Sequence, residues 1–155
     1  MIVELWTDGA IHKNGRPEAV GGWACIMLAK QNGEIVREKE MSGAKRAPGT
    51  TSNEMELRGV LEGLTTLAPG HAGRIEVHVY TDSEYVQKGF DFRADRWAHE
   101  GWKPRANLEI IKQIYDLSKK FLVHYHWVPG HAGHKYNERA DELAVEAKEK
   151  EMGIR

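Results

Sequence analysis

The spacing of apolar and polar residues divides the chain into short strands and two-faced helices. In residues 1–8 both alternating sets are mostly apolar, which is typical of a strand covered on both sides. We therefore expect a central strand that ends at Asp8-Gly9. Residues 22–29 and 35–41 have the pattern of two further strands, with a tight turn at residues 31–33. Together these segments predict a three-stranded antiparallel meander.

The middle of the chain predicts a helix followed by a fourth strand. Residues 51–54 have the Thr-x-x-Glu form of a capping box, which marks the start of a helix. Glu56 falls at the margin of its apolar face, where a carboxylate needs a partner. Pro69-Gly70 would end the helix, and residues 75–81 alternate as a strand that stops at Asp82. Because such crossovers are right-handed, we expect this strand to lie parallel to the first and beside it.

The rest of the pattern predicts two longer helices and one more strand, without internal repeats. We expect a single domain over residues 1–150 and a frayed tail over residues 151–155. The predicted segments are loops at residues 10–21, 42–49 and 129–134, a short helix at 83–88, an aromatic and charged stretch at 90–105, a helix that opens at Asn107, a fifth strand at 122–128 and a last helix from about 137 to 148.

Composition narrows the class of protein. A chain of 155 residues with 41% apolar content can bury a core of its own. With 22 basic and 23 acidic residues there is no global positive charge, so any contact with nucleic acid must be local. Cys25 has no partner for an internal disulfide and reads as a small buried residue. The first residues carry no basic leader and no long apolar stretch, so we expect a reducing, cytoplasmic location without membrane contact.

Four carboxylates stand where the predicted fold could bring them together: Asp8, Glu56, Asp82 and Asp141. Like charges within a few ångströms repel, and a fold tolerates them when cations occupy the site. Oxygen ligands favour Mg²⁺ or Mn²⁺ over zinc, and two such ions can activate a water and stabilise the leaving oxygen of a phosphodiester. In the alternative interpretation the four acids are scattered as helix caps and surface charges.

Four segments resemble the motif blocks of the ribonuclease H family, type 1 branch. They are Thr7-Asp8-Gly9, Met55-Glu56-Leu57, residues 81–86 and residues 127–144, and the last of these is very specific. The resemblance implies an α/β ribonuclease H-like fold, with a five-stranded mixed sheet of order 3-2-1-4-5 flanked by helices. Strands 1–3 would be antiparallel, and strands 4 and 5 parallel to strand 1. It also implies hydrolysis of the RNA strand of RNA/DNA hybrids to 3′-hydroxyl and 5′-phosphate ends.

The resemblance further implies two Mg²⁺ ions per active site, with Mn²⁺ as a possible substitute. Asp8 would bridge both ions, Asp141 would complete the site of the ion that activates water, and Glu56 and Asp82 would hold the other. His131 matches a family histidine that assists proton transfer or product departure. An imidazole titrates near neutrality, and its glycine-bounded loop can move toward a phosphate. We expect the protein to act as a monomer.

Contacts with the hybrid are also implied by matching positions. The 2′-hydroxyl distinguishes RNA from DNA and is read across a shallow minor groove. Residues 93–105 resemble the family's basic and aromatic substrate handle, although Ala98-His99-Glu100 replaces a segment that is often lysine-rich in bacterial relatives. The matching residues are Gly9, Asn14, Ser52, Asn53 and Glu84 for the minor groove, Thr51 and Asn107 for a DNA phosphate, and Trp97 and Trp102 for the handle. Several of these residues alone would be read as turn, cap or core residues.

Three other classes remain open from the sequence. One is a hybrid-binding module without catalysis, although all four carboxylates are retained. Another is an integrase or junction resolvase of the same fold, which would lack the Gly-His-Ala-Gly loop. In the last, His124, His126, His131 and His134 form a site for a softer metal, which requires the loop histidines to fold back onto the strand.

Overall fold

The computed structural model describes residues 1–69 and 75–154, so the predicted helix end at Gly70 and the last tail residue, Arg155, lie outside the described residues. The strands form one sheet of order β3-β2-β1-β4-β5, which confirms the predicted order. The first three strands pair antiparallel, and β4 and β5 continue the sheet in parallel. The strands are β1 (Ile2–His12), β2 (Val20–Gln31), β3 (Glu34–Arg46), β4 (Glu76–Thr81) and β5 (Leu122–Trp127).

The meander is longer than the sequence predicts. The expected loops at residues 10–21 and 42–49 are partly strand: Ala10 pairs with Gly22, and Val20 pairs with Arg46. The prediction was wrong there because it relied on side-chain character. Backbone pairing continues through these polar and small residues, since the hydrogen bonds of a ladder do not depend on the side chains.

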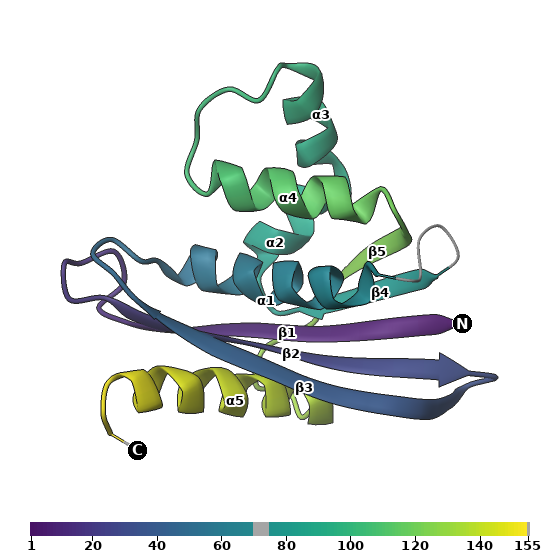
Figure 1. Cartoon of the computed structure of the whole chain (residues 1–155), viewed down its shortest axis with the longest axis horizontal. Coiled ribbons are helices and arrows are strands. Elements are labelled where there is room, and N and C mark those ends of the chain that lie inside the picture. The colour runs from purple at the N-terminus through teal and green to yellow at the C-terminus, as the bar shows by residue number, and fades with distance from the viewer. Residues whose placement is uncertain (70–74, 155) are drawn as a thin grey trace.

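Helices cover both faces of the sheet (Figure 1). The side chain of Thr51 accepts a hydrogen bond from the Glu54 N–H (3.2 Å), which confirms the predicted cap. The predicted aromatic stretch is largely helical, with a π-helical segment at Gly89–Arg93. The last helix reaches Glu151, and the Ile154 N–H donates back to the Glu149 carbonyl (3.0 Å) as a closing turn. The helices are α1 (Ser52–Leu67), α2 (Glu84–Lys88), α3 (Ala94–His99), α4 (Leu108–Ser118) and α5 (Lys135–Glu151).

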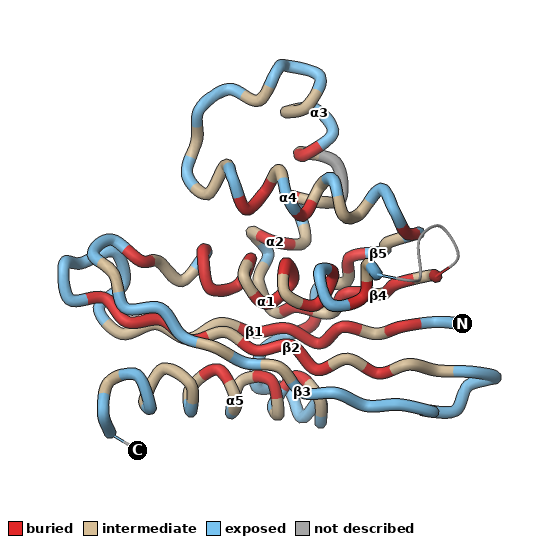
Figure 2. The backbone as a smooth tube through the Cα atoms, in the orientation of Figure 1, coloured by how far each residue is buried: buried red, intermediate tan, exposed pale blue. Residues whose placement is uncertain are grey.

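The main core lies between the sheet and α1. Val3 and Leu5 of β1 and Val77 and Val79 of β4 are buried against α1 and α4, and Figure 2 shows this inner layer as the buried part of the chain. A Cβ on Gly59 of α1 would stand 2.7 Å from the Ala24 carbonyl oxygen, so the helix backbone sits directly on the strands. On the other face α5 packs against β1, β2 and β3. Among the described residues, no helix has the length and apolar character required to cross a membrane.

Candidate active site

Parallel pairing of β1 and β4 brings two carboxylates together at one end of the sheet. The register pairs Trp6 with Tyr80, so two residues further along Asp8 lies beside Asp82. Glu56 reaches the same point from the second turn of α1. One carboxylate oxygen from each of the three residues lies within 4.8 Å of the others. The structure therefore assembles a trio that the sequence pattern could only suggest.

The trio is buried. Asp8 is 4% exposed and Glu56 is 8% exposed. The Gly9 N–H donates to Oδ1 of Asp8 at 2.9 Å. A Cβ at Gly9 would stand 2.8 Å from the backbone nitrogen of Glu56, so only glycine lets α1 come this close to the strand end. Oε2 of Glu56 is buried and has no hydrogen-bond partner in the described part of the chain.

Burial and mutual repulsion set the protonation of the trio. Desolvation, followed by the charge of Asp82, raises the pKa of Asp8 to about 8. The pKa of Glu56 is raised well above its usual value, first by burial and then by the charges of Asp8 and Asp82. Burial is also the main cause that raises the pKa of Asp82. Without a counter-charge, Asp8 holds its proton near neutral pH, and the pKa of each of the other two acids is shifted in the same direction.

The donor set fits divalent cations. The ligands are carboxylate oxygens, which suit hard ions, and the trio gathers them within reach of one ion. The unpartnered Oε2 of Glu56 is what a cation would satisfy. A bound cation would also favour the ionised form of each acid, in place of the protons that the trio holds without it.

Asp141 and His131 complete the arrangement from the C-terminal third of the chain. Asp141 lies on α5, close enough that its charge raises the pKa of both Asp8 and Asp82. His131 is exposed and favours the ionised form of Asp82 through its own charge. Its loop is held against that acid, because a Cβ on Gly130 would stand 2.9 Å from Oδ2 of Asp82. All five predicted catalytic residues thus gather at one end of the sheet.

The predicted minor-groove residues fall partly into one patch. Oδ1 of Asn14 accepts a hydrogen bond from the Ser52 N–H at 3.0 Å, so the first loop is fastened to the start of α1. Asn53 follows in the same turn and is exposed. Glu84 stands at the start of α2, exposed and paired with Lys88 at 3.1 Å. These contacts place Asn14, Ser52 and Asn53 together.

The predicted handle residues also have structural contacts. Trp97 and Trp102 are partly buried and pack against the main core. The guanidinium of Arg105 lies 3.9 Å from the centre of the Trp97 ring, and Trp102 meets Tyr115 edge to face. Asn107 precedes α4 with a left-handed backbone, and its side chain donates to the Tyr85 hydroxyl at 3.4 Å. Both tryptophans therefore have a core role whatever else they contact.

The four-histidine metal site is not formed as the sequence interpretation had it. His124 and His126 share a face of β5 and stack with His78 of β4. His134 lies near Trp6 instead, and His131 near Asp82. The strand histidines and the loop histidines belong to different parts of the sheet.

Asn137 is a buried polar residue that the sequence interpretation missed. It is 2% exposed and lies one turn before Asp141 on α5. Its amide is near enough to favour ionised Asp82, although its nitrogen makes no hydrogen bond of standard geometry. The spacing of four residues from Asp141 was the available signal, since such residues share a helix face.

A mixed sheet with acids gathered at its strand ends is an arrangement whose oxygen ligands fit a divalent cation. The family model for RNase H matches residues 1–149. Ribonuclease H of Paramagnetospirillum magneticum is 42% identical over 149 residues, covering 93% of this chain and 88% of its own length. The crystal structure of LC9-RNase H1, a type 1 RNase H with the type 2 active-site motif, is 32% identical with a TM-score of 0.79, covering 96% of this chain and 72% of that one.

The crystal structure of LC11-RNase H1 in complex with an RNA/DNA hybrid has a TM-score of 0.69 at 21% identity, and so shares the fold. It covers 97% of this chain and 99% of its own. The match of nearly the whole chain to the family model and to curated relatives means that this protein belongs to the ribonuclease H family.

The raised pKa of Asp8 predicts that the metal-free protein loses stability as the pH rises. The unfolded pKa is about 4, whereas the folded value is about 8. The stabilising proton is therefore fully present below pH 4 and is lost as the pH rises through 8. Each such proton contributes a slope of up to about 1.4 kcal/mol per pH unit. Urea unfolding in a chelating buffer should show this fall, and added Mg²⁺ should reverse it at the alkaline end.

Asp8→Asn is the matched control, because it removes the titrating group and keeps the shape. Its unfolding free energy should vary less over the same pH range, with the remaining slope due to Glu56 and Asp82. An unchanged slope in this variant would contradict the assignment of the proton to Asp8.

Proposed function

We propose that this protein is an endoribonuclease that hydrolyses the RNA strand of RNA/DNA hybrids and leaves 3′-hydroxyl and 5′-phosphate ends. The observation that carries the proposal is the trio of Asp8, Glu56 and Asp82, whose oxygens lie within 4.8 Å of one another at the strand ends. Family membership over residues 1–149 supports the same activity.

The proposed cofactor is Mg²⁺, with Mn²⁺ as a substitute and two ions per site. Asp8, Glu56, Asp82 and Asp141 would hold them. When bound, the ions supply a lowered pKa for an attacking water and positive charge beside the scissile phosphate. The protein's part is to present ionised oxygens in fixed positions. Burial fixes Asp8 and Glu56, and the protons that they hold in the free protein must leave when cations bind.

His131 is proposed to move a proton. It is exposed on a loop beside Asp82, with a left-handed backbone (φ 56°). Its imidazole can accept or donate a proton near neutral pH without being a ligand. We assign it to proton transfer at the leaving oxygen or to departure of the product.

Recognition of the hybrid is proposed to use the patch at the start of α1. Asn14, Ser52 and Asn53 lie together there, and short polar side chains with backbone groups suit the 2′-hydroxyls of a shallow groove. Gly9 and Glu84 are proposed to take part in the same recognition. Thr51 and Asn107 would hold a phosphate of the DNA strand, and the exposed parts of Trp97 and Trp102 would pack on sugars. We propose that the protein acts as a monomer.

The first activity prediction concerns Asp8→Asn. Removing one charge from the bridging position weakens the whole cation site, so turnover should fall below detection, while folding and hybrid binding stay near wild type. The measurement is Mg²⁺-dependent cleavage of the labelled RNA strand, with binding followed separately. Asp116→Asn on the exposed side of α4 is the matched control and should keep full activity. Near wild-type cleavage by Asp8→Asn would refute the proposed mechanism and leave a hybrid-binding module as the alternative.

The second prediction is that His131→Ala slows turnover without abolishing it. Acid–base assistance typically contributes about 10² to 10⁴ in rate, and the carboxylates remain in place. KM should change little. Steady-state kinetics should separate the fall in turnover number from any change in KM. If this variant were as inactive as Asp8→Asn, the histidine would be a ligand or a structural requirement.

The third prediction concerns Glu100→Lys at the end of α3. Glu100 lies 3.9 Å from Arg96 and partly neutralises it, in an otherwise basic segment. The new lysine should tighten hybrid binding at low salt and steepen the salt slope by about one unit, because one more phosphate is neutralised. The turnover number should stay nearly constant, because this contact stabilises the ground state and the transition state equally.

The matched control for this change is Glu34→Lys at the turn between β2 and β3, which alters the charge equally elsewhere. In that variant the dependence of hybrid affinity on salt concentration should match that of wild type. If plots of log affinity against log salt have the same slope for Glu100→Lys and wild type, α3 does not touch the duplex.

A further inference from the structure

A second group of metal-binding side chains lies near the start of β4, away from the carboxylate trio. Glu76 and His78 come from β4 and His124 from β5, and one donor atom from each lies within 4.8 Å of the others. The parallel register pairs His78 directly with His124. Val77 and Val79 alternate with them and are buried on the opposite face. The fold itself therefore brings these three side chains together.

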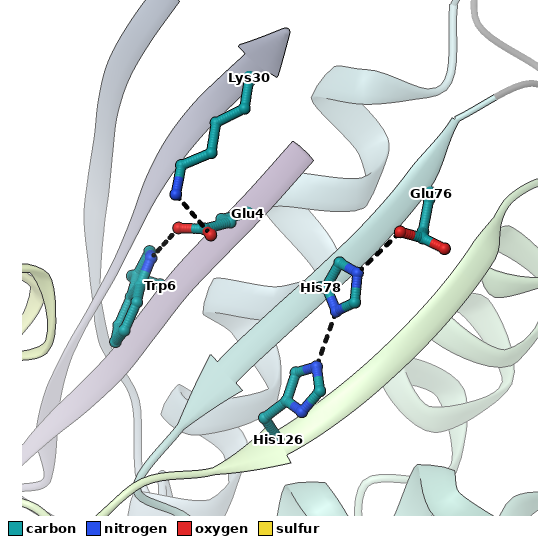
Figure 3. Close-up of polar contacts among 6 residues, drawn as sticks. All are labelled: Glu4, Trp6, Lys30, Glu76, His78 and His126. Carbon is teal, nitrogen blue, oxygen red and sulfur yellow. Dashed lines mark hydrogen bonds and ion pairs between the residues drawn. The ribbon is translucent and has the colours of Figure 1, made fainter. Parts of the chain in front are cut away.

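Glu76 joins the two histidines. Its Oε2 lies 3.0 Å from Nε2 of His78, and its Oε1 lies 3.7 Å from Nε2 of His124. Figure 3 shows Glu76 and His78 pointing toward each other from β4. A tetrahedral ion with ligands about 2.0–2.1 Å away holds its ligand atoms roughly 3.3 Å apart. The 3.0 Å contact between Oε2 and His78 is close to that value, whereas the 3.7 Å contact to His124 is made by the other oxygen, so side-chain rotation is needed to bring all three ligand atoms around one ion.

His126 contacts the ring of His78 from outside the group. Its Nε2 lies 2.7 Å from Nδ1 of His78, on the side of the ring that faces away from Glu76. If His78 carries its proton on Nδ1 and donates it to His126, its Nε2 offers a lone pair toward Glu76. Metal-binding histidines commonly donate the other ring N–H to an acceptor in this way, which fixes the tautomer.

The group is open to solvent, so an ion can enter. Helix α5 packs on the same side of the sheet but against β1, β2 and β3. The side chain of His124 is 44% exposed, that of Glu76 37% and that of His78 22%. The nearest covering groups are the stacked rings of Tyr80 and His126, whose centres are 4.8 Å apart.

We propose that Glu76, His78 and His124 form a binding site for one transition-metal ion of the zinc class, with a fourth position left to water. Two imidazoles and a carboxylate suit Zn²⁺, Ni²⁺ or Cu²⁺, whereas Mg²⁺ prefers an all-oxygen set. The site is distinct in chemistry and in place from the carboxylate trio. Nothing in the hydrolytic reaction requires it.

The ion would link β4 to β5, because two of its ligands lie on β4 and one lies on β5. These strands are adjacent in the sheet, and both lead to the active-site end: the Val128 N–H donates to the Thr81 carbonyl at 2.9 Å, and Nε1 of Trp127 donates to the Asp82 carbonyl at 3.1 Å. An ion that binds only the folded sheet stabilises it in proportion to the logarithm of its concentration. The expected role is therefore to stabilise the edge of the sheet that carries Asp82.

The test is a calorimetric titration of Zn²⁺ into the whole chain with excess Mg²⁺ present, so that the carboxylate trio is occupied by its own ion. We expect one Zn²⁺ per chain and a melting temperature that rises with zinc. His78→Gln/His124→Gln should lose saturable binding and the zinc-dependent rise. Glu76→Gln, an exposed single change, should bind at least about tenfold more weakly, and His126→Phe, which keeps the ring stack, about 10- to 100-fold more weakly.

The matched control is His12→Gln/His99→Gln, which removes two histidines outside the group and should bind zinc as wild type does. Equal zinc binding by wild type and by His78→Gln/His124→Gln, or no binding in excess Mg²⁺, would overturn the proposal. Should the double variant not fold, Glu76→Gln and His126→Phe decide the question, since wild-type affinity in both would also overturn it.

Discussion

The parallel pairing of β1 with β4 is the constraint on which the rest of this structure depends. Its register, Trp6 with Tyr80, determines that Asp8 and Asp82 end side by side. The crossover through α1 then brings Glu56 to the same edge, because α1 must lie on the apolar face of both strands. A shift of this register by one residue would turn every side chain of β4 to the other face and separate the acids.

The position of the acids disfavours their ionised form. Asp8 and Glu56 are nearly inaccessible, so burial raises the pKa of both, and the charge of Asp8 raises that of Glu56 further. Two glycines increase the crowding around the acids. A side chain on Gly9 would collide with the backbone of Glu56, and a side chain on Gly130 would collide with the carboxylate of Asp82. Such an arrangement is stable without cations only while protons remain on the acids. Destabilisation of the free protein and affinity for cations are therefore two results of the same packing.

Much of the fold was predictable because local signals agreed with the global pattern. The capping box at Thr51, the right-handed crossover and the strand order were all confirmed. The extent of the meander was not, because its exposed ends carry polar residues that look like loop, as at His12. The histidine group was missed for a different reason. Its members lie 46 residues apart in sequence, and only the β4–β5 register, which no local pattern specifies, pairs His78 with His124.

Two ligand sets of different chemistry lie along β4, one near its start and one just past its end, and stacked rings lie beside the strand between them. Trp6 and Tyr80 stack at 4.2 Å, and Tyr80 stacks on His126 at 4.8 Å. Asp82 follows His78 by four positions, a span of roughly 13 Å at about 3.3 Å per residue. Buried charges are screened by salt much less than exposed ones, and Asp8 is only 4% exposed. The two sites can therefore be coupled through charge as well as through the backbone of β4 and β5, as a change in how firmly Asp82 is held.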